Sequence, residues 1–246
     1  MNFISDIGRY SQFMALVLKR PQKWRVSSKQ LIREFNDIGV NSIGIVSLMS
    51  VFMGAVITLQ TAANIDSPLI PAYTIGFTTR QSIILEFSPT IIALILAGKV
   101  GSSIASQLGT MRITEQIDAL AMMGVRSASF LVMPKILAAV LFFPFLITLS
   151  MGLGIVGGWI FGLLASVVTT ADYIDGLRLD FDSFSYTYAM IKTVVFAFLV
   201  TSISAFNGFY AKGSALEVSK SSTRAVVSSS IAILISNYLI TQILLL

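Results

Sequence analysis

The 246-residue sequence contains no cysteine and no histidine. Without cysteine there is no disulfide and no thiolate nucleophile, and without either residue the usual ligands of zinc are missing. The lack of histidine also excludes an imidazole base and a Ser–His–Asp triad. No GxxxxGK[ST] loop is present, so any ATP-driven activity needs an ATPase on another chain. We therefore expect no enzyme active site, no metal and no cofactor within this chain.

Charge is scarce as well. Only 12% of the residues are charged and 55% are hydrophobic, whereas a soluble domain carries about 25% charged residues. So apolar a chain indicates a membrane protein. The net charge of +5 is compatible with nucleic-acid binding, but the excess of Lys and Arg on cytoplasmic loops of membrane proteins explains it better. We expect no nucleic-acid partner.

Long apolar runs predict an all-α integral membrane protein with five spans, because a spanning helix needs about 20 mostly apolar residues. The uncharged run 136–171 is interpreted as one span plus an interfacial or re-entrant piece. With the N-terminus in the cytoplasm, this topology leaves only Arg80, Arg178 and Lys192 of the 17 basic residues towards the outside, as the positive-inside rule expects. The other predicted spans are residues 42–61, 75–100, 193–211 and 225–246.

The N-terminal segment has a different pattern. Residues 1–40 are predicted to form an interfacial amphipathic region, and residues 41–246 the membrane domain. The basic run KRPQKWR at 19–25 places Trp24 at the headgroup layer, either as a simple anchor or as a lipid sensor. The apolar residues of the amphipathic helix are Phe3, Ile4, Ile7, Tyr10, Phe13, Met14 and Val17.

Small residues recur at every fourth position near the end of the second span. Ala97, Gly101, Ala105 and Gly109 form a stripe on one helix face. Such a stripe lets another backbone approach closely, so it predicts tight helix packing. The pattern leaves open whether the neighbouring helix belongs to the same chain or to a second copy.

A short polar helix is predicted after this stripe. Thr114 suits an N-cap and Gly124 a C′ position. The roughly nine residues between them span about 13 Å, too little to cross a bilayer. On the cytoplasmic side, such a helix is either a lever for a soluble motor or a connector lying on the membrane. Acceptors near its start are Glu115, Gln116 and Asp118, and its shared apolar face is Ile113, Ile117, Leu120 and Ala121.

Glu86 is the acid within the second span. A carboxylate at this depth is costly and is expected to face a cavity or a partner. Lys99 on the same helix would lie about 20 Å away, whereas Arg80 is on the same side of the membrane. A structural or lipid-headgroup contact is favoured, and a proton relay is the alternative.

Two long blocks carry a family resemblance. LEFSPTIIALILAGKVGSSIASQLGTMRITEQIDALAMMGV, followed by FLVMPKILA, and IKTVVFAFLVTSISAFNGFYAKGSALEVSKSSTRAVVSSSIAIL at 191–234 resemble the MlaE (YrbE) family of ABC-transporter permeases. The resemblance implies a homodimer of five-span subunits in the bacterial inner membrane. It also implies cytoplasmic ABC ATPase subunits that bind ATP and Mg, and a periplasmic Mce-domain protein ring. The implied cargo is phospholipid, moved between inner and outer membranes.

The resemblance also assigns residues. It makes the short helix an ATPase-coupling helix and places a lipid site near Gln60 and Glu86. Relatives often read Arg-Glu-Leu-Gly-Pro where this chain has Leu85 before Glu86, so either headgroup recognition differs or Arg80 substitutes for the missing cation in the lipid site. The alternatives are an ABC permease for a sterol or fatty acid, a proton-driven secondary transporter using Glu86, and a membrane scaffold. The expected coupling residues are Thr114, Glu115, Gln116, Ile117, Asp118, Ala119, Leu120 and Met123.

Overall fold

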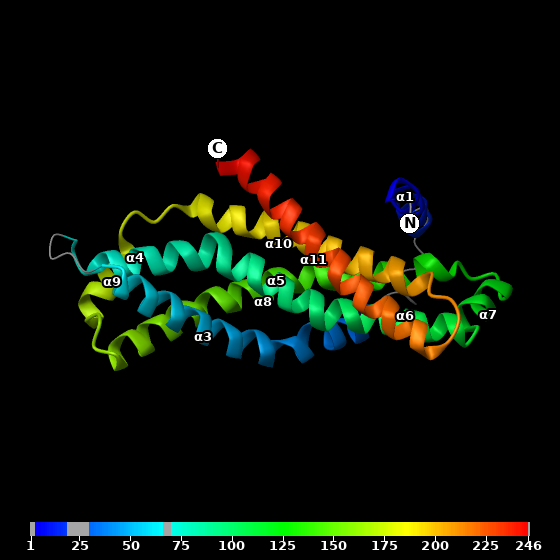
Figure 1. Ribbon diagram of the computed structural model, residues 1–246, viewed down its shortest axis with the longest axis horizontal. Helices are drawn as coiled ribbons and strands as arrows, with labels where there is room; N and C mark the ends of the chain where they lie inside the picture. Colours follow the sequence, from blue (N-terminus) through cyan, green and yellow to red (C-terminus); the bar gives the residue numbers. More distant parts are fainter. Residues whose placement is uncertain (1–2, 19–29, 66–69, 246) are drawn as a thin grey trace. The chain divides into compact units, whose positions relative to one another are not determined.

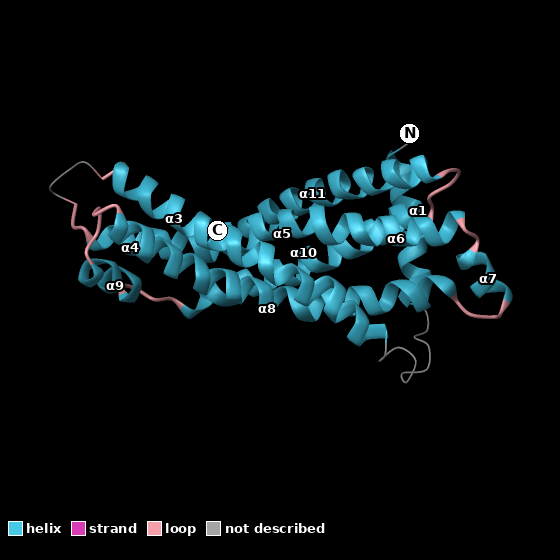
Figure 2. Cartoon of the chain, turned by 90° about the horizontal axis from the view of Figure 1, so that it is seen from below, coloured by secondary structure: helices cyan, strands magenta, loops and turns pink. Residues whose placement is uncertain are grey.

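The computed structural model describes residues 3–18, 30–65 and 70–245, and these residues form helices and connecting loops without a strand (Figure 2). The all-α prediction is therefore confirmed. The basic run at 19–25, including Trp24, lies outside the described residues, and its role as an anchor stays a prediction.

Five helices in the described part of the chain are long and apolar enough to cross a membrane (Figure 1). This confirms the five-span prediction, although the helices extend well beyond the predicted apolar runs. The chain is a multi-pass membrane protein. The candidate spans are Gln30–Ala63, Tyr73–Ile113, Ser127–Leu164, Ser183–Phe209 and Ala215–Leu244.

The first two spans contain widened turns. Helix α3 (Asn41–Ala63) follows the π-helical turn η1 (Phe35–Val40), at the predicted boundary between residues 40 and 41, which stays a prediction. Pro89 lies inside the π-helical stretch of the second span, where its missing N–H and its ring are incompatible with regular α-helical bonding. The second span consists of α4 (Tyr73–Ser82), η2 (Ile83–Ile91), α5 (Ile92–Leu96), η3 (Ala97–Gly101) and α6 (Ser102–Ile113).

The uncharged run 136–171 belongs mainly to one helix. Helix α8 (Ser127–Leu164) is continuous, so no re-entrant break interrupts it. The separate piece expected within this run is not found: the next helix, α9 (Thr170–Arg178), begins only where the run ends, and its N-cap Thr169 accepts a hydrogen bond from the Asp172 backbone N–H. The prolines of α8, Pro134 and Pro144, lie in its first half, and Lys135 is the charged residue within it. The remaining helices are α1 (Phe3–Leu18), α7 (Gln116–Met122), α10 (Ser183–Phe209) and α11 (Ala215–Leu245).

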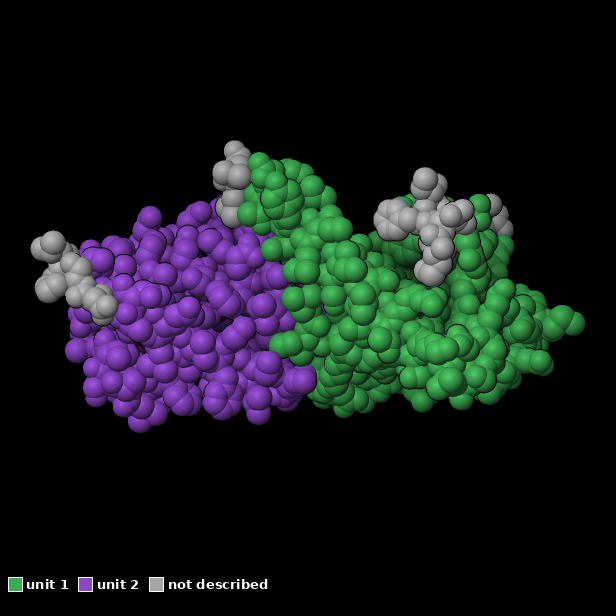
Figure 3. Space-filling model, in the orientation of Figure 1, with its two compact units in different colours: residues 1–42, 94–143, 194–246 green, residues 43–93, 144–193 purple. Residues whose placement is uncertain are grey.

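The chain divides into two compact units (Figure 3). Unit 1 comprises residues 1–42, 94–143 and 194–246, and unit 2 comprises residues 43–93 and 144–193. In unit 2, the hydroxyl of buried Tyr173 donates to the carbonyl of Ile155 at 3.1 Å. Burial raises the pKa of Tyr173 to about 12, so this hydroxyl keeps its proton and remains a donor at neutral pH.

Glycines allow α3 and α8 to touch through their backbones within unit 2. A Cβ at Gly54 would overlap the carbonyl oxygen of Gly154, and one at Gly157 would overlap the carbonyl oxygen of Val51. Only residues without a side chain fit this crossing. The glycines of α8 therefore serve close packing against α3.

Replacing Gly54 with alanine should destabilise the chain by about 1–3 kcal/mol, because the added methyl forces the two helices apart. Gly154→Ala is the matched control: its Cβ would meet Ile83 at 3.4 Å and the Ser50 carbonyl at 3.5 Å, which is ordinary contact. Unfolding of both purified variants in detergent micelles measures the difference. Equal stability of the two variants would contradict this contact.

The small-residue stripe is buried within unit 1. Ala97 and Ala105 are fully buried. Ideal Cβ atoms at Gly101 and Gly109 would lie 2.8 Å from the Ser204 hydroxyl and 3.0 Å from Val218, respectively. These neighbours belong to α10 and α11, so the stripe packs against helices of the same chain.

Helix α1 packs on α10 through part of its apolar face. The ring of buried Phe13 lies 5.2 Å from that of Phe209 and 5.8 Å from that of Phe206, centroid to centroid. Tyr10 and Ser202 share a hydrogen bond of 2.7 Å. Ile7, by contrast, is 52% exposed. The amphipathic helix is thus held by protein on one side and offers apolar surface on another.

Candidate functional site

Glu86 pairs with a lysine inside the membrane span. Lys192 of α10 is fully buried, and its Nζ lies 2.6 Å from Glu86 Oε1. The same Nζ lies 4.3 Å from the centroid of the Tyr188 ring. Thr90 donates to Glu86 Oε2 at 3.1 Å. The expectation that Glu86 lacks a nearby cation unless Arg80 supplies it is wrong.

The local backbone adds a third contact to the buried ammonium. Pro89 has no N–H to donate to the carbonyl of Leu85, four residues earlier. Lys192 Nζ donates to this carbonyl at 3.3 Å. The side chain of Glu86 is 42% exposed while that of Lys192 is 0% exposed. The site therefore presents a carboxylate supported from behind by a lysine.

Arg80 has a different task. It is 4% exposed and donates to the carbonyls of Leu177 at 2.6 Å and Asp180 at 3.1 Å. Its guanidinium also lies over the ring of Phe77 and over that of Phe181, at 5.3 and 5.6 Å from their centroids. Arg80 therefore holds the C-terminal end of α9 in place, and no hydrogen bond or ion pair between Arg80 and Glu86 is found among the described residues. The guanidinium of Arg80 carries five N–H donors, so it can serve both carbonyls at once.

Gln60, the third residue of the predicted lipid site, lies one turn before the end of α3, and its side chain is exposed. Its carbonyl accepts a hydrogen bond from the Asn64 backbone N–H at 3.2 Å. Its contact with lipid stays a prediction.

The short helix after the stripe starts later than predicted. Thr114 is the C-cap of α6, and its hydroxyl donates to the Thr110 carbonyl at 2.8 Å, so its assignment as N-cap is wrong. Glu115 precedes α7 with a left-handed φ of 59° and makes no side-chain cap bond. Helix α7 therefore has 7 residues. The threonine hydroxyl bonds back to the preceding turn, which competes with capping the next one.

The end of α7 follows the prediction. Gly124 has a φ of 76°. The backbone N–H of Val125 donates to the Leu120 carbonyl at 3.0 Å, and that of Gly124 to the Ala121 carbonyl at 3.0 Å. This pair of bonds is a Schellman motif, which requires a left-handed residue at C′. Gly124 is thus confirmed as the C′ residue.

One face of α7 packs against the rest of the chain, and the C-terminal end of the helix is exposed. Ile117 is 1% exposed, and Asp118 forms an ion pair of 2.6 Å with Arg112 of α6. Met122 is 90% exposed and Met123 70% exposed. Ala121, predicted to share an apolar face with Ile117, is exposed. The helix therefore has an exposed apolar tip, formed by Met122 and Met123, and is held in place by Ile117 and the Arg112–Asp118 pair.

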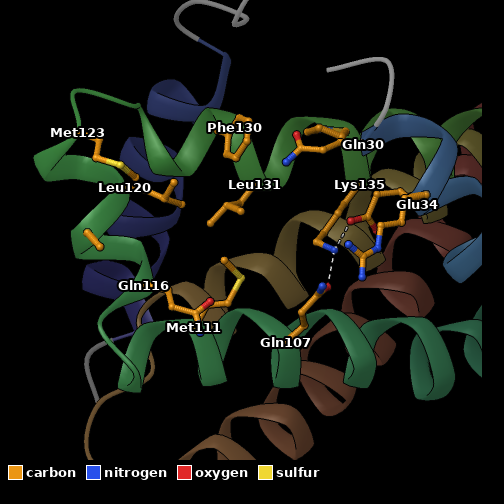
Figure 4. A pocket seen from close by; sticks show the side chains of 13 residues that line it. Gln30, Glu34, Gln107, Met111, Gln116, Leu120, Met123, Phe130, Leu131 and Lys135 are labelled. Carbon is orange, nitrogen blue, oxygen red and sulfur yellow. Dashed lines mark hydrogen bonds and ion pairs between the residues drawn. The ribbon is translucent and has the colours of Figure 1, made fainter. Parts of the chain in front are cut away.

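A cavity of about 470 Å³ lies behind α7 (Figure 4). At its end, Lys135 Nζ of α8 lies 2.6 Å from both Glu34 Oε1 and Gln107 Oε1, and Lys135 is 3% exposed. This bond network joins α6 and α8, the helices that flank α7, to the start of the first span. Sequence reasoning counted Lys135 only as a cytoplasmic cation, because its partners lie far away in the chain.

The chain is similar to known proteins over nearly its whole length. The family described as "Permease MlaE" matches residues 31–243. A probable ABC transporter permease protein of Rickettsia prowazekii is 32% identical over 243 residues, covering 99% of this chain and 93% of the relative. The intermembrane phospholipid transport system permease protein MlaE of Haemophilus influenzae is 30% identical over 250 residues, covering 99% and 94%. The chloroplastic protein TRIGALACTOSYLDIACYLGLYCEROL 1 of Arabidopsis thaliana is 29% identical, covering 94% and 65%.

Proposed function

Because the chain belongs to the MlaE family of ABC-transporter permeases, we propose that it is the membrane subunit of an ATP-driven transporter that moves phospholipid between inner and outer membranes of a bacterial envelope. The printed name of the Haemophilus influenzae relative, an intermembrane phospholipid transport permease, supports this cargo. The observation in this chain that carries the proposal is the Glu86–Lys192 pair within a membrane span.

The pair suits a polar headgroup inside an otherwise apolar protein surface. Ionisable groups are expensive at this depth and usually mark a substrate pathway. The partly exposed member is the carboxylate of Glu86, whereas Lys192 is fully buried behind it. We therefore expect Glu86 to accept a hydrogen bond from a donor on the lipid headgroup, such as an ammonium group. Gln60 is proposed as a further contact of the lipid, whereas Arg80 would act only indirectly, by fixing the end of α9.

We propose α7 as the element that contacts a cytoplasmic ABC ATPase, which would bind ATP and Mg. The exposed tip formed by Met122 and Met123, with Glu115 at the other end, supports this role. Asp118 is engaged by Arg112, so it positions α7 as well as contributing charge. The N-terminus would then lie in the cytoplasm, and the membrane would be the bacterial inner membrane.

A second copy of the chain is the proposed partner within the membrane. Only 11% of the apolar window of α11 is buried, against 39–56% in the other four candidate spans. Exposed side chains at its C-terminal half, Tyr238, Leu239 and Ile243, offer an apolar surface to a second subunit. A periplasmic Mce-domain ring, implied by the family, is proposed for the opposite side of the membrane.

Reconstitution tests the function. The chain and the proposed partner ABC ATPase are placed in vesicles with fluorescent phospholipid, and transfer to an acceptor particle is followed with and without ATP. We expect ATP-dependent transfer and co-purified phospholipid. Transfer of only sterol or fatty acid would assign another cargo. Transfer driven by a proton gradient without ATP, and lost in Glu86→Gln, would favour a secondary transporter, and no substrate dependence would favour a scaffold.

A further inference from the structure

A second cavity lies far along the chain from Glu86, entirely within unit 1. Its volume is about 640 Å³, and α1, α10 and α11 line it. This is the size of cavities that hold small-molecule ligands. It is distinct from the cavity behind α7, since the two share no lining residue.

One end of this cavity is cationic. Four basic side chains line it, against the single acid Glu217. Lys220 forms an ion pair of 2.7 Å with Glu217. Basic residues outnumber acids in this lining, which favours an anionic group. The basic lining residues are Arg9, Lys212, Lys220 and Arg224.

The other end is apolar. Along α11, Lys220 and Arg224 are followed on the same helix face by Ser228, Ile231 and Ile235, all of which line the cavity. Residues three or four positions apart lie one above another on a helix, so polarity falls steadily along this wall. From Lys220 to Ile235 the wall runs for about 22 Å. Such a gradient fits an amphiphile with a negative head and a hydrocarbon tail.

The wall opposite α11 also changes from polar to apolar along its length. Tyr210, near the end of α10, lies beneath the Arg9 guanidinium at 5.4 Å, whereas Ile203 and Phe206 lie further into the span. Helix α1, whose Ile7 and Tyr10 close the cavity, is the amphipathic helix expected at the membrane surface. The cavity thus opens where lipid headgroups of the leaflet beside the N-terminal helix would lie.

We propose that this groove binds one anionic phospholipid of the cytoplasmic leaflet, with its phosphate at Lys220 and Arg224 and an acyl chain along Ile231 and Ile235. The bound lipid would contact both α1 and α11, whose residues line the groove together. This site is separate from the proposed transport site at Glu86. Its occupancy requires neither ATP nor the ATPase.

Photocrosslinking tests this site. The full chain is placed in nanodiscs containing equal amounts of phosphatidylglycerol and phosphatidylcholine, one of them carrying a photoactivatable acyl chain, and labelled peptides are mapped. We expect phosphatidylglycerol to label residues 228–235 more than phosphatidylcholine does. K220Q/R224Q should reduce this labelling roughly 30-fold, since each basic residue near an anionic lipid contributes about a fivefold change in binding. R126Q/R178Q, which removes two exposed cations elsewhere, should leave it unchanged.

Further experiments distinguish a phospholipid in the groove from a soluble phosphate or a second copy of the chain. A232F narrows the apolar end while keeping every charge, so it should also reduce the labelling. Soluble glycerol phosphate should not compete, because it lacks the acyl chain. Equal labelling by both lipids, or full competition by glycerol phosphate, would overturn the proposal. Efficient disulfide formation by I235C in the otherwise cysteine-free chain would overturn it too, by assigning the groove to a second copy.

Discussion

Replacing Glu86 with leucine should destabilise the chain by about 3–5 kcal/mol, because it leaves the charge of Lys192 buried without its partner. Replacing Lys192 with methionine should cost clearly less. The Glu86 side chain is 42% exposed and can still be solvated, whereas Lys192 is 0% exposed and cannot. The Leu85 carbonyl and the Tyr188 ring, which remain near Lys192, only partly compensate the lost carboxylate. The asymmetry follows from burial alone.

Unfolding of the purified variants in detergent micelles measures both changes. The double variant E86L/K192M should recover most of the loss, since replacing both members of a buried pair with apolar residues is often neutral. Glu217→Leu is the matched control: its ion pair with Lys220 is exposed at both members, so its loss should cost less than about 1 kcal/mol. Equal losses for E86L and E217L would show that the buried lysine does not depend on Glu86.

Changing Met122 and Met123 together to aspartate should abolish binding of the ABC ATPase and, with it, ATP-dependent transport. Both side chains are largely exposed, so the fold does not need them. In a docked complex the same positions would bury two unpaired charges, each costing several kcal/mol. A loss of about 4 kcal/mol already weakens binding roughly a thousandfold.

Affinity pull-down of the ATPase and its hydrolysis rate in the complex are the measurements. I70D/L179D is the matched control, because it also places two aspartates at exposed apolar positions on other loops. This control should retain ATPase binding. The earlier expectation for charge is tested separately by E115K/D118K, which also breaks the Arg112–Asp118 pair. Full ATPase binding by M122D/M123D would exclude α7 from the interface.

The fold was largely predictable because the length of an apolar run is a local property of a membrane sequence. The five spans and the Gly124 terminus of α7 follow from such signals. The start of α7 was mispredicted because Thr114 had two hydrogen-bond options, and bonding back to Thr110 won. The length of α8 was underestimated because apolar composition does not mark where a helix enters the interface.

The candidate site was predictable only in part. Glu86 was singled out because a lone acid in an apolar run is unusual, but its partner could not be found by the same means. Lys192 lies 106 positions away and borders a polar loop in the sequence, so it resembled an ordinary loop cation. Arg80 was closer along the chain, but the carbonyls at the end of α9 bind it instead. Which residues pair over a long range depends on how the helices cross, and a single sequence does not reveal these crossings.

The separation of Glu86 and Lys192 along the chain has a genetic consequence. A chimera joined to a relative anywhere between residues 91 and 191 would take the acid from one parent and the lysine from the other. A second parent without a lysine at position 192 would leave Glu86 without this partner in one of the two products. The two positions therefore need to be inherited together for the ion pair to form.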